Sequence, residues 1–290
     1  MVARALALSA GNVEKFEREL ASQLRRWILT LPAAVGLATL RSCGKLVLGF
    51  GPKRSGVYSA GNGPAMRSAL LGVCADSNSH LSDLVRASTR VTHTDPKAEE
   101  GALLVARAAR ITAVGSRTEP IAFLDQAASE IAGEELRGNI EAAVAGLREA
   151  QSPFAFAESQ GWSDGISGYI NRTVPAALYC WANSPTNFRQ CVENAVLLGG
   201  DSDSVAAITG AVCGANLGND KIPPEWIARL SEWPRTTNWM NRLAEAVAEA
   251  SKANNSRTPP PMYWLATIPR NVIFAAIVLG LGLRRLLPPY

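Results

Sequence analysis

Several features that would define a class of metalloprotein are missing from this sequence. Its 290 residues include only two histidines and five cysteines, and no two cysteines form a Cys-x-x-Cys pair. A structural zinc site usually needs such a pair, and secreted disulfide frameworks use an even number of cysteines. We therefore expect no zinc site and a reducing, cytoplasmic location for Cys43, Cys74, Cys180, Cys191 and Cys213.

Blocks of like charge are also absent. The 29 Lys and Arg and the 25 Asp and Glu give a net charge of +4 that is spread along the whole chain. This pattern does not indicate a nucleic-acid partner. It would slightly favour an anionic small ligand, but a solvated surface with no ligand carries the same balance. With 47% hydrophobic and 19% charged residues, the composition argues against disorder.

An apolar run near the C-terminus is too short to read as a membrane span. Residues 271 to 283 are nearly all apolar, but a membrane-spanning helix needs roughly 20 such residues. The sequence therefore predicts no membrane span. It predicts instead a C-terminal helix that packs back on the body through Ile273, Phe274, Ile277 and Val278.

Strand-like alternation is scarce, and apolar residues recur three or four positions apart from end to end. The fold class expected is an all-α helical bundle, and no fixed repeat indicates a solenoid. We expect one helical domain over 1–252, then a linker and an apolar helix over 253–290. The expected helices cover 13–29, 33–48, 63–74, 80–89, 96–113, 119–131, 134–149, 174–181, 185–198, 204–218, 223–233 and 239–252.

The most informative motif is the run Gly199-Gly-Asp-Ser-Asp-Ser204, which stands directly before an expected helix. Carboxylates and hydroxyls are the oxygen ligands that Mg²⁺ prefers, and Asp201 and Asp203 could both point toward one cation from a turn. Ser204 could supply a further oxygen. These residue types also cap helices very often, so the local pattern leaves both interpretations open.

The same run resembles the Gly-Gly-Asp-Thr-Asp-Thr motif of the ADP-ribosylglycohydrolase family, relatives of the enzyme that removes ADP-ribose from dinitrogenase reductase. Both Thr-to-Ser differences keep a hydroxyl group. Four further stretches occur in the family's order, and five ordered motifs are far more specific than one. These stretches are residues 59–67 (SAGNGPAMR), 92–96 (THTDP), 168–179 (GYINRTVPAALY) and 222–226 (IPPEW).

The resemblance implies an all-α bundle with two Mg²⁺ ions in the active site, Mn²⁺ being the alternative metal. It implies that Asp201, Asp203 and Ser204 are metal ligands and that the two aspartates act in catalysis. A metal-bound water would attack the anomeric carbon of the ribose. Helix capping remains the competing role of these residues.

The resemblance also implies a set of ligand-binding residues. Asn62 and Gly63 are expected to contact the ADP-ribose, with Met66 beside it, and Arg67 is expected to form a structural salt bridge. His93 is expected beside the ribose, although Thr94 or Asp95 could simply cap the next helix there. Tyr169 could pack against the adenosine or fill the core below Pro175.

The implied function is hydrolysis of the glycosidic bond between ADP-ribose and an acceptor, with an arginine N-glycoside preferred. The partner would be an ADP-ribosylated protein or a small molecule that contains ADP-ribose. The alternative is a non-catalytic member of the same fold that binds ADP-ribose or is purely structural, because a fold does not determine an activity.

The family completes its metal site with a Thr-Asp-Asp-Thr run near the N-terminus, and this sequence contains no Asp-Asp pair. Residues 1–8 resemble the middle of the helix that follows that run and lack an N-cap. We therefore expect that the reading frame starts late or that the gene has lost its beginning, so that the chain as given has little activity.

Overall fold

The computed structural model describes residues 1–113 and 119–286, and these residues form helices and loops without a strand of any length. The first half contains α1 (Val2–Ser9), α2 (Val13–Ile28), α3 (Leu37–Val47), α4 (Pro52–Ser55), η1 (Ala65–Arg67), α5 (Ala69–Cys74), α6 (Asn78–Arg90), α7 (Pro96–Ala113) and α8 (Pro120–Glu130). The second half contains α9 (Glu134–Arg148), α10 (Pro153–Ser159), α11 (Ile170–Asn183), α12 (Phe188–Leu197), α13 (Ser202–Leu217), η2 (Asn219–Lys221), α14 (Pro224–Arg229), α15 (Thr237–Ala253), η3 (Trp264–Ala266) and α16 (Thr267–Leu286). The all-α class expected from the sequence is confirmed.

Local sequence signals explain most of the helix boundaries. The side chains of Asn12, Ser152 and Thr236 accept hydrogen bonds from backbone amides in the first turns of α2, α10 and α15. The helices expected over 13–29, 96–113, 134–149 and 204–218 form within two residues of those limits. Other limits were less accurate. The helices predicted from residues 33, 174 and 185 start at Leu37, Ile170 and Phe188, the one predicted over 63–74 is divided into η1 and α5, and the one predicted to reach 233 ends at Arg229.

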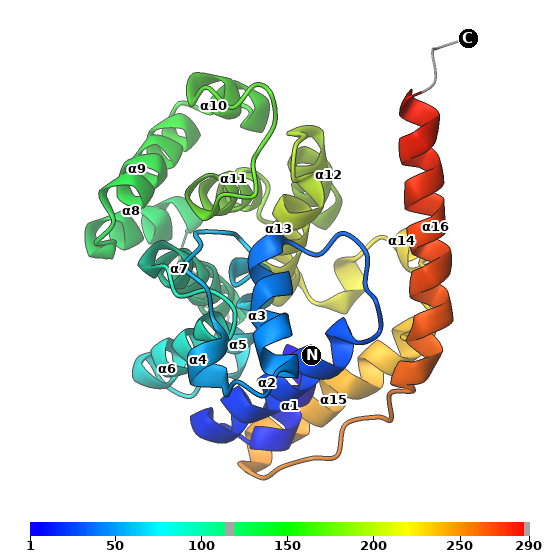
Figure 1. Cartoon of the computed structure of the whole chain (residues 1–290). Helices are drawn as coiled ribbons and strands as arrows, with labels where there is room; N and C mark the ends of the chain where they lie inside the picture. The colour runs from blue at the N-terminus through cyan, green and yellow to red at the C-terminus, as the bar shows by residue number, and fades with distance from the viewer. Residues whose placement is uncertain (114–118, 287–290) are drawn as a thin grey trace.

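Helices α7, α11 and α13 pack against one another in the middle of the bundle, with α8 and α9 on one side and α5 on the other (Figure 1). Twelve of the residues of α11 are buried. A second core lies between α1, α2 and α6. The backbones of α5 and α7 meet at Gly72, where an added Cβ would lie 1.9 Å from the carbonyl oxygen of Ala106. That close approach excludes any other residue at position 72.

Three isolated backbone bridges connect the loops at one end of this core. They pair Val57 with His93, Gly61 with Tyr169, and Ile166 with Gly200. Each bridge joins loops that lie more than 30 positions apart in sequence. The helices therefore hold these loops in place from below while the bridges connect them to one another.

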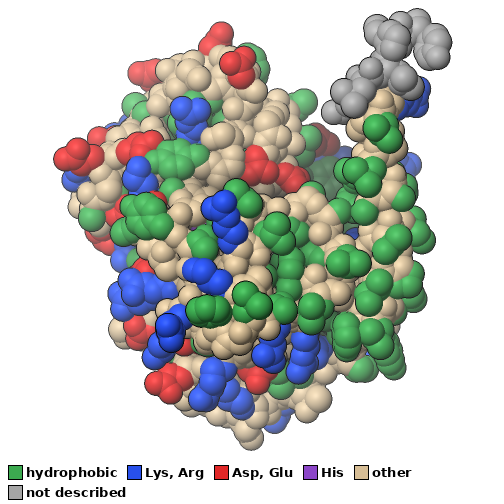
Figure 2. All heavy atoms as spheres, in the orientation of Figure 1, with side chains coloured by type: hydrophobic (Ala, Val, Ile, Leu, Met, Phe, Trp, Pro, Cys, Tyr) green, Lys and Arg blue, Asp and Glu red, His purple; other side chains and the backbone are tan. Residues whose placement is uncertain are grey.

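The C-terminal helix differs from the sequence expectation. α16 is 20 residues long and stands along one side of the body in Figure 1, with apolar side chains over its surface in Figure 2. The residues expected to pack on the body are largely exposed: Ile273 61%, Phe274 45%, Ile277 54% and Val278 42%. The prediction of a buried terminal helix was wrong, because an apolar run indicates only that water is unfavourable and not which surface replaces it. The helix from Trp264 to Arg284 is long and apolar enough to cross a membrane, by length and composition alone.

Candidate active site

The candidate site is built from the bridged loops and the start of α13. The amide of Asn62 donates to the carbonyl of Gly168 at 3.0 Å, and the amide of Asp201 donates to the carbonyl of Ile166 at 2.7 Å. The amide of Ile170 donates to Ala60 at 2.9 Å. These bonds bring the 60–62 loop and the Asp-rich turn to the same short segment before α11.

Two glycines, Gly200 of the Asp-rich motif and Gly165 of the facing loop, are required by this geometry. Gly200 has φ +67°, and a Cβ there would lie 2.3 Å from the carbonyl oxygen of Ile166. Its neighbour across the bridge, Gly165, has φ +104° and would place a Cβ 2.5 Å from the amide nitrogen of Gly200. Only glycine combines left-handed backbone with such a close approach. The motif therefore sets where Asp201 stands.

The Asp201 side chain contacts both the bridged loops and the first turn of α13. It makes no hydrogen bond that caps α13. Its Oδ2 accepts a hydrogen bond from Nδ2 of Asn62 at 2.6 Å, and its Oδ1 accepts one from the Ser204 hydroxyl at 2.9 Å. Nδ2 of Asn62 also donates to the Thr173 hydroxyl at 3.1 Å. The sequence predicts that Asp201 and Asp203 lie together at the mouth of the main cleft, near Asn62 and His93. The contact of Asp201 with Asn62, 139 positions away, confirms that part of the prediction, while the ligand roles stay predictions.

Asp203 behaves differently from Asp201. Its side chain is exposed, and its Oδ1 accepts a hydrogen bond from the amide of Ser204 at 2.9 Å. This contact lies within the first turn of its own helix, and no described side chain caps α13. The structure therefore joins Asp201, Ser204 and Asn62 in one network and leaves the Asp203 carboxylate outside it.

His93 lies beneath the 61–63 loop. It is 2% exposed, and a Cβ added at Gly61 or Gly63 would come within 3.1 Å and 3.3 Å of its ring. Its Nδ1 is 2.8 Å from the Thr92 hydroxyl. Burial, and the nearby charge of Arg67, lower the pKa of His93 to about 4, so the ring is neutral at pH 7.

Arg67 holds the same region from the other side. Its guanidinium donates to the carbonyls of Gly63 and Ser88 and to the hydroxyls of Ser88 and Thr92. No carboxylate of a described residue lies within salt-bridge distance of it, so the expected salt bridge was wrong. Burial lowers the pKa of Arg67 to about 10, which leaves it charged at pH 7. The loop is held by hydrogen bonds instead of by an ion pair.

The turn after His93 matches the capping alternative at one residue. Oδ1 of Asp95 accepts a hydrogen bond from the amide of Lys97 at 3.0 Å, at the start of α7. Asp95 thus serves the helix, while His93 supports the loop. Sequence reasoning missed Thr173, whose hydroxyl also donates to the carbonyl of Ser167 at 2.9 Å. It lies within the quoted 168–179 stretch, but nothing in its spacing sets it apart.

Tyr169 lies at the rim of the site and does not fill the core. Its hydroxyl donates to the Glu135 carboxylate at 2.5 Å and accepts from Nζ of Lys97 at 2.7 Å. Nδ2 of Asn171 donates to the same carboxylate at 3.0 Å. The hydrogen bond from Tyr169, with those from Asn171 and Lys97, holds the pKa of Glu135 below its usual value. The Tyr169 ring is therefore held in place by residues of α7 and α9.

The oxygen donors described above could supply only part of the ligands of one cation. In the described part of the chain, no three His, Cys, Asp or Glu side chains gather closely enough to hold a metal ion. One carboxylate, Asp201, meets hydroxyl groups, and both of its oxygens already accept hydrogen bonds. Two Mg²⁺ ions need more carboxylates than this. The residues described here do not fit a two-cation centre by themselves.

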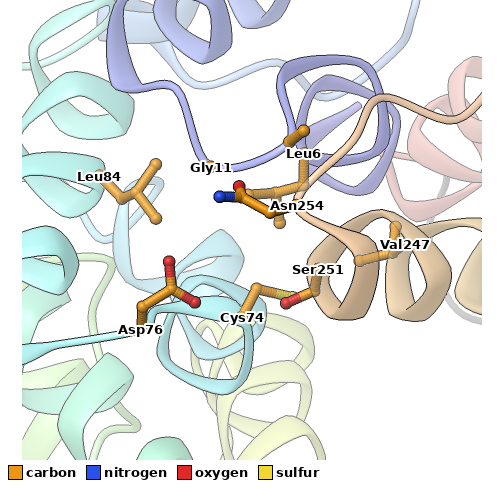
Figure 3. Close-up of a pocket in the computed structure, with 9 residues that line it drawn as sticks. Leu6, Gly11, Cys74, Asp76, Leu84, Val247, Ser251 and Asn254 are labelled. Carbon is orange, nitrogen blue, oxygen red and sulfur yellow. The ribbon is translucent and has the colours of Figure 1, made fainter.

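One cavity borders the 61–63 loop, and a second lies elsewhere in the body. The first, of about 560 Å³, is lined by Gly63, Met66, Arg67 and Thr39 together with apolar residues of α1, α2 and α5. The cavity drawn in Figure 3 is much smaller, about 20 Å³, and lies between α1, α5 and α15. Its size and its polar lining of Asp76, Ser251 and Asn254 suit a single water.

Comparison with known proteins supports one family. Residues 1–257 match the family model "ADP-ribosylglycohydrolase". The chain is 26% identical over 232 residues to ADP-ribosylhydrolase ARH3 of Gallus gallus, which covers 68% of this chain and 61% of that protein. It is 30% identical over 176 residues to the ADP-ribosyl-[dinitrogen reductase] glycohydrolase of Rhodospirillum rubrum, covering 59% and 51%. The chain thus spans about half to three fifths of the length of these curated relatives.

The fold agrees with a solved structure described as an ADP-ribosylglycohydrolase-related protein complex. The two superpose with a TM-score of 0.65 at 26% sequence identity, over 86% of this chain and 80% of that one. The family model covers every element from α1 to α15, and the five motifs noted in the sequence lie inside the matched range. On these grounds, the chain belongs to the ADP-ribosylglycohydrolase family.

Proposed function

We propose that this protein hydrolyses the glycosidic bond between ADP-ribose and an acceptor, with an arginine N-glycoside as the preferred linkage. Family membership supports the reaction class. The observation that carries the proposal for this chain is the 2.6 Å hydrogen bond between Asn62 and Asp201, because it joins two of the family-type motifs at one point. The substrate would be an ADP-ribosylated protein or a small molecule that contains ADP-ribose.

In the proposed reaction, a water oxygen forms a bond to the anomeric carbon and the bond from that carbon to the acceptor breaks. The acceptor leaves with a proton, and free ADP-ribose is the second product. The Asp201 carboxylate can accept hydrogen bonds from water or from a ribose hydroxyl, and Asn62 and Ser204 fix its orientation. His93 is neutral at pH 7 and supports the loop that carries Asn62.

The ADP-ribose would lie over the 61–63 loop and the Gly168-Tyr169 segment, which the backbone bridge between Gly61 and Tyr169 brings together. Tyr169 would offer its ring to the adenosine. The hydrogen bonds from Lys97 and to Glu135 fix that ring before the ligand arrives, and a fixed aromatic side chain loses little conformational entropy on binding.

For the metal, we propose Mg²⁺, with Mn²⁺ as the alternative, and Asp201, Asp203 and Ser204 as ligands. Carboxylate and hydroxyl oxygens suit these cations. Because the described residues fit only one side of a cation site, we derive no step of the reaction from the metal. We expect weak binding of a single ion.

The second candidate is a protein that binds ADP-ribose without cleaving its linkage. This candidate is favoured by a different observation, namely that the described residues do not gather three metal-type ligands. The two candidates share the ligand surface at Asn62, Gly63, His93 and Tyr169 and differ only in turnover.

One assay separates the two candidates. Release of ADP-ribose from ADP-ribosyl-arginine is measured with and without Mg²⁺ for the wild type, for Asp201→Asn, and for Asp220→Asn as a matched control on the exposed turn after α13. The hydrolase predicts slow Mg²⁺-dependent release, in keeping with the incomplete cation site, that Asp201→Asn abolishes and Asp220→Asn preserves. Binding of ADP-ribose without release supports the second candidate, and the absence of both contradicts the two together.

A further inference from the structure

The strongest unexplained feature outside the candidate site is α16 together with the cavity at its base. From Val272 to Arg284, every described residue of the helix except Ala275 is exposed. Residues 272 to 283 are all apolar or glycine. A helix that is apolar on all sides is normally enclosed by a protein core or by lipid, and the described part of the body encloses only the base of this one.

The base of α16 is fixed to the body. Nδ2 of Asn271 donates to the carbonyl of Thr30 at 2.7 Å and to its hydroxyl at 3.1 Å, and both residues are buried. Arg270 forms an ion pair with Glu232. The helix therefore projects from a defined position, and in Figure 1 the body lies entirely on one side of it. A flat surface can meet α16 along its length without meeting the rest of the molecule.

A cavity of about 270 Å³ lies between the base of α16 and the body, and its chemistry is unusual. Four arginines and three tryptophans line it, and no Asp or Glu is among the lining residues: Arg4, Arg26, Arg235, Arg270, Trp27, Trp239 and Trp264. Arg235 and Arg270 share the single carboxylate of Glu232. Positive charge thus exceeds the negative charge that contacts it.

Two of these guanidinium groups are incompletely satisfied. Among the described residues, Nε of Arg4 and Nε of Arg235 are buried and have no hydrogen-bond partner. Burial and the charge of Arg26 lower the pKa of Arg4. Arginine donors in this arrangement suit a phosphate, which accepts several charge-assisted hydrogen bonds at once.

We propose that α16 lies in the interface of an anionic phospholipid bilayer, and that the arginine cavity at its base receives the phosphate of a lipid headgroup. The 20-residue helix is about 30 Å long and would bury its apolar surface in the acyl region. The tryptophans at its base, with exposed Tyr263, match the aromatic residues that gather at membrane interfaces.

The charge at both ends of the helix agrees with this arrangement. Arg270 stands at the base and exposed Arg284 follows the apolar stretch, so long side chains at both ends can reach the headgroup layer. A second copy of the chain is the competing occupant. It would cover α16 but would bring no phosphate to the arginine cavity, whose lining includes no Asp or Glu.

The test is flotation of the full chain with vesicles of phosphatidylcholine alone and of phosphatidylcholine mixed with phosphatidylserine. We expect the protein to float with both and more strongly with the anionic vesicles. Ile277→Arg should weaken binding to both by at least about tenfold. Arg26→Gln should weaken binding to the anionic vesicles by about fivefold and have little effect on the neutral ones.

Two matched controls keep the comparison specific. Leu48→Arg replaces an apolar residue that is 78% exposed directly after α3, and Arg18→Gln removes an exposed charge from α2 outside the cavity. Both should float like the wild type. Circular dichroism confirms that each variant is folded before flotation.

Three results would overturn the proposal. The first is a wild type that stays with the soluble fraction, or an Ile277→Arg variant that floats equally well. The second is a dimer in light scattering without vesicles that Ile277→Arg dissociates, which would assign α16 to a second copy. The third is saturable quenching of tryptophan fluorescence by inorganic phosphate in a protein that does not float, which would assign the cavity to a soluble anion.

Discussion

Helices α11 and α16 are both rich in apolar residues and both contain a proline, yet they have opposite surroundings. α11 buries twelve residues between α7, α9 and α13. α16 leaves residues such as Ile277 and Leu279 more than half exposed. The difference shows that apolar composition indicates only that a helix is shielded from water. The neighbouring elements determine whether protein provides that shielding. The first two predictions below contrast substitutions on the α11 side with matched substitutions on α16, and the next two concern the α11 side alone, all in solution and without lipid.

The largest difference is expected between two leucines. Leu178→Ala in α11 removes a fully buried side chain and should lower the free energy of unfolding by about 3 kcal/mol. Leu279→Ala in α16 removes one that is 67% exposed and should change it by less than about 0.5 kcal/mol. Denaturant unfolding measures both. Equal losses would mean that α16 is part of the core.

The next difference is expected between two glycines. Gly200 lies beside the segment that precedes α11. In Gly200→Ala, a left-handed backbone is combined with a Cβ 2.3 Å from the Ile166 carbonyl oxygen, so the free energy of unfolding should fall by about 3 kcal/mol. Gly280→Ala in α16 meets nothing within 4 Å and should favour the helix by about 0.5 kcal/mol. Thermal unfolding of the two variants provides the check, and a tolerated Gly200→Ala would contradict the bridge to Ile166.

Acid should destabilise the α11 side through His93. Its pKa is lowered to about 4 in the folded protein, while an unfolded histidine has a pKa near 6.5. Between these values the unfolded chain binds the extra proton, so stability falls as pH falls from 6.5 toward 4. The loss between pH 7 and pH 5 should be up to about 2 kcal/mol for this group. His93→Gln should remove that component, and an unchanged pH dependence in the variant would refute the assignment.

The smallest effect concerns the polar network of the site. Asn62→Ala removes the donor to Asp201 and Thr173 and should lower the free energy of unfolding by about 1 to 2 kcal/mol, because a buried hydroxyl and a partly buried carboxylate each lose a partner. Asn238→Ala, on an exposed part of α15, is the control and should be neutral. If urea unfolding places both variants at the wild-type value, the network does not stabilise the loops.

The sequence allowed the helical class, the main helices and the five ordered motifs to be predicted. It also indicated that the motifs around Asn62 and Asp201 meet. Periodicity could not show the three backbone bridges, because each is one residue pair between loops. For the same reason Thr173 went unnoticed, and the contrast between Asp201 and Asp203 depends on side-chain directions that spacing does not determine.

The surroundings of α16 were mispredicted for a different physical reason. The apolar run of residues 271 to 283 was counted alone, whereas the helix extends from Thr267 to Leu286. Its burial depends on whether any other element reaches it, which is a property of the tertiary arrangement. Likewise, Arg67 was expected to pair with a carboxylate, but it donates instead to the carbonyls of nearby Gly63 and distant Ser88 and to the hydroxyl of distant Thr92.

The most direct measurement for the proposed site is calorimetric titration of ADP-ribose into the wild type, Asn62→Ala and the Asn238→Ala control. Binding by the wild type and by the control, with affinity reduced by about tenfold in Asn62→Ala, is the expected result. Absence of binding by the folded wild type, or equal affinity in all three proteins, would contradict the claim that the joined Asn62 and Asp201 loops form the ADP-ribose site.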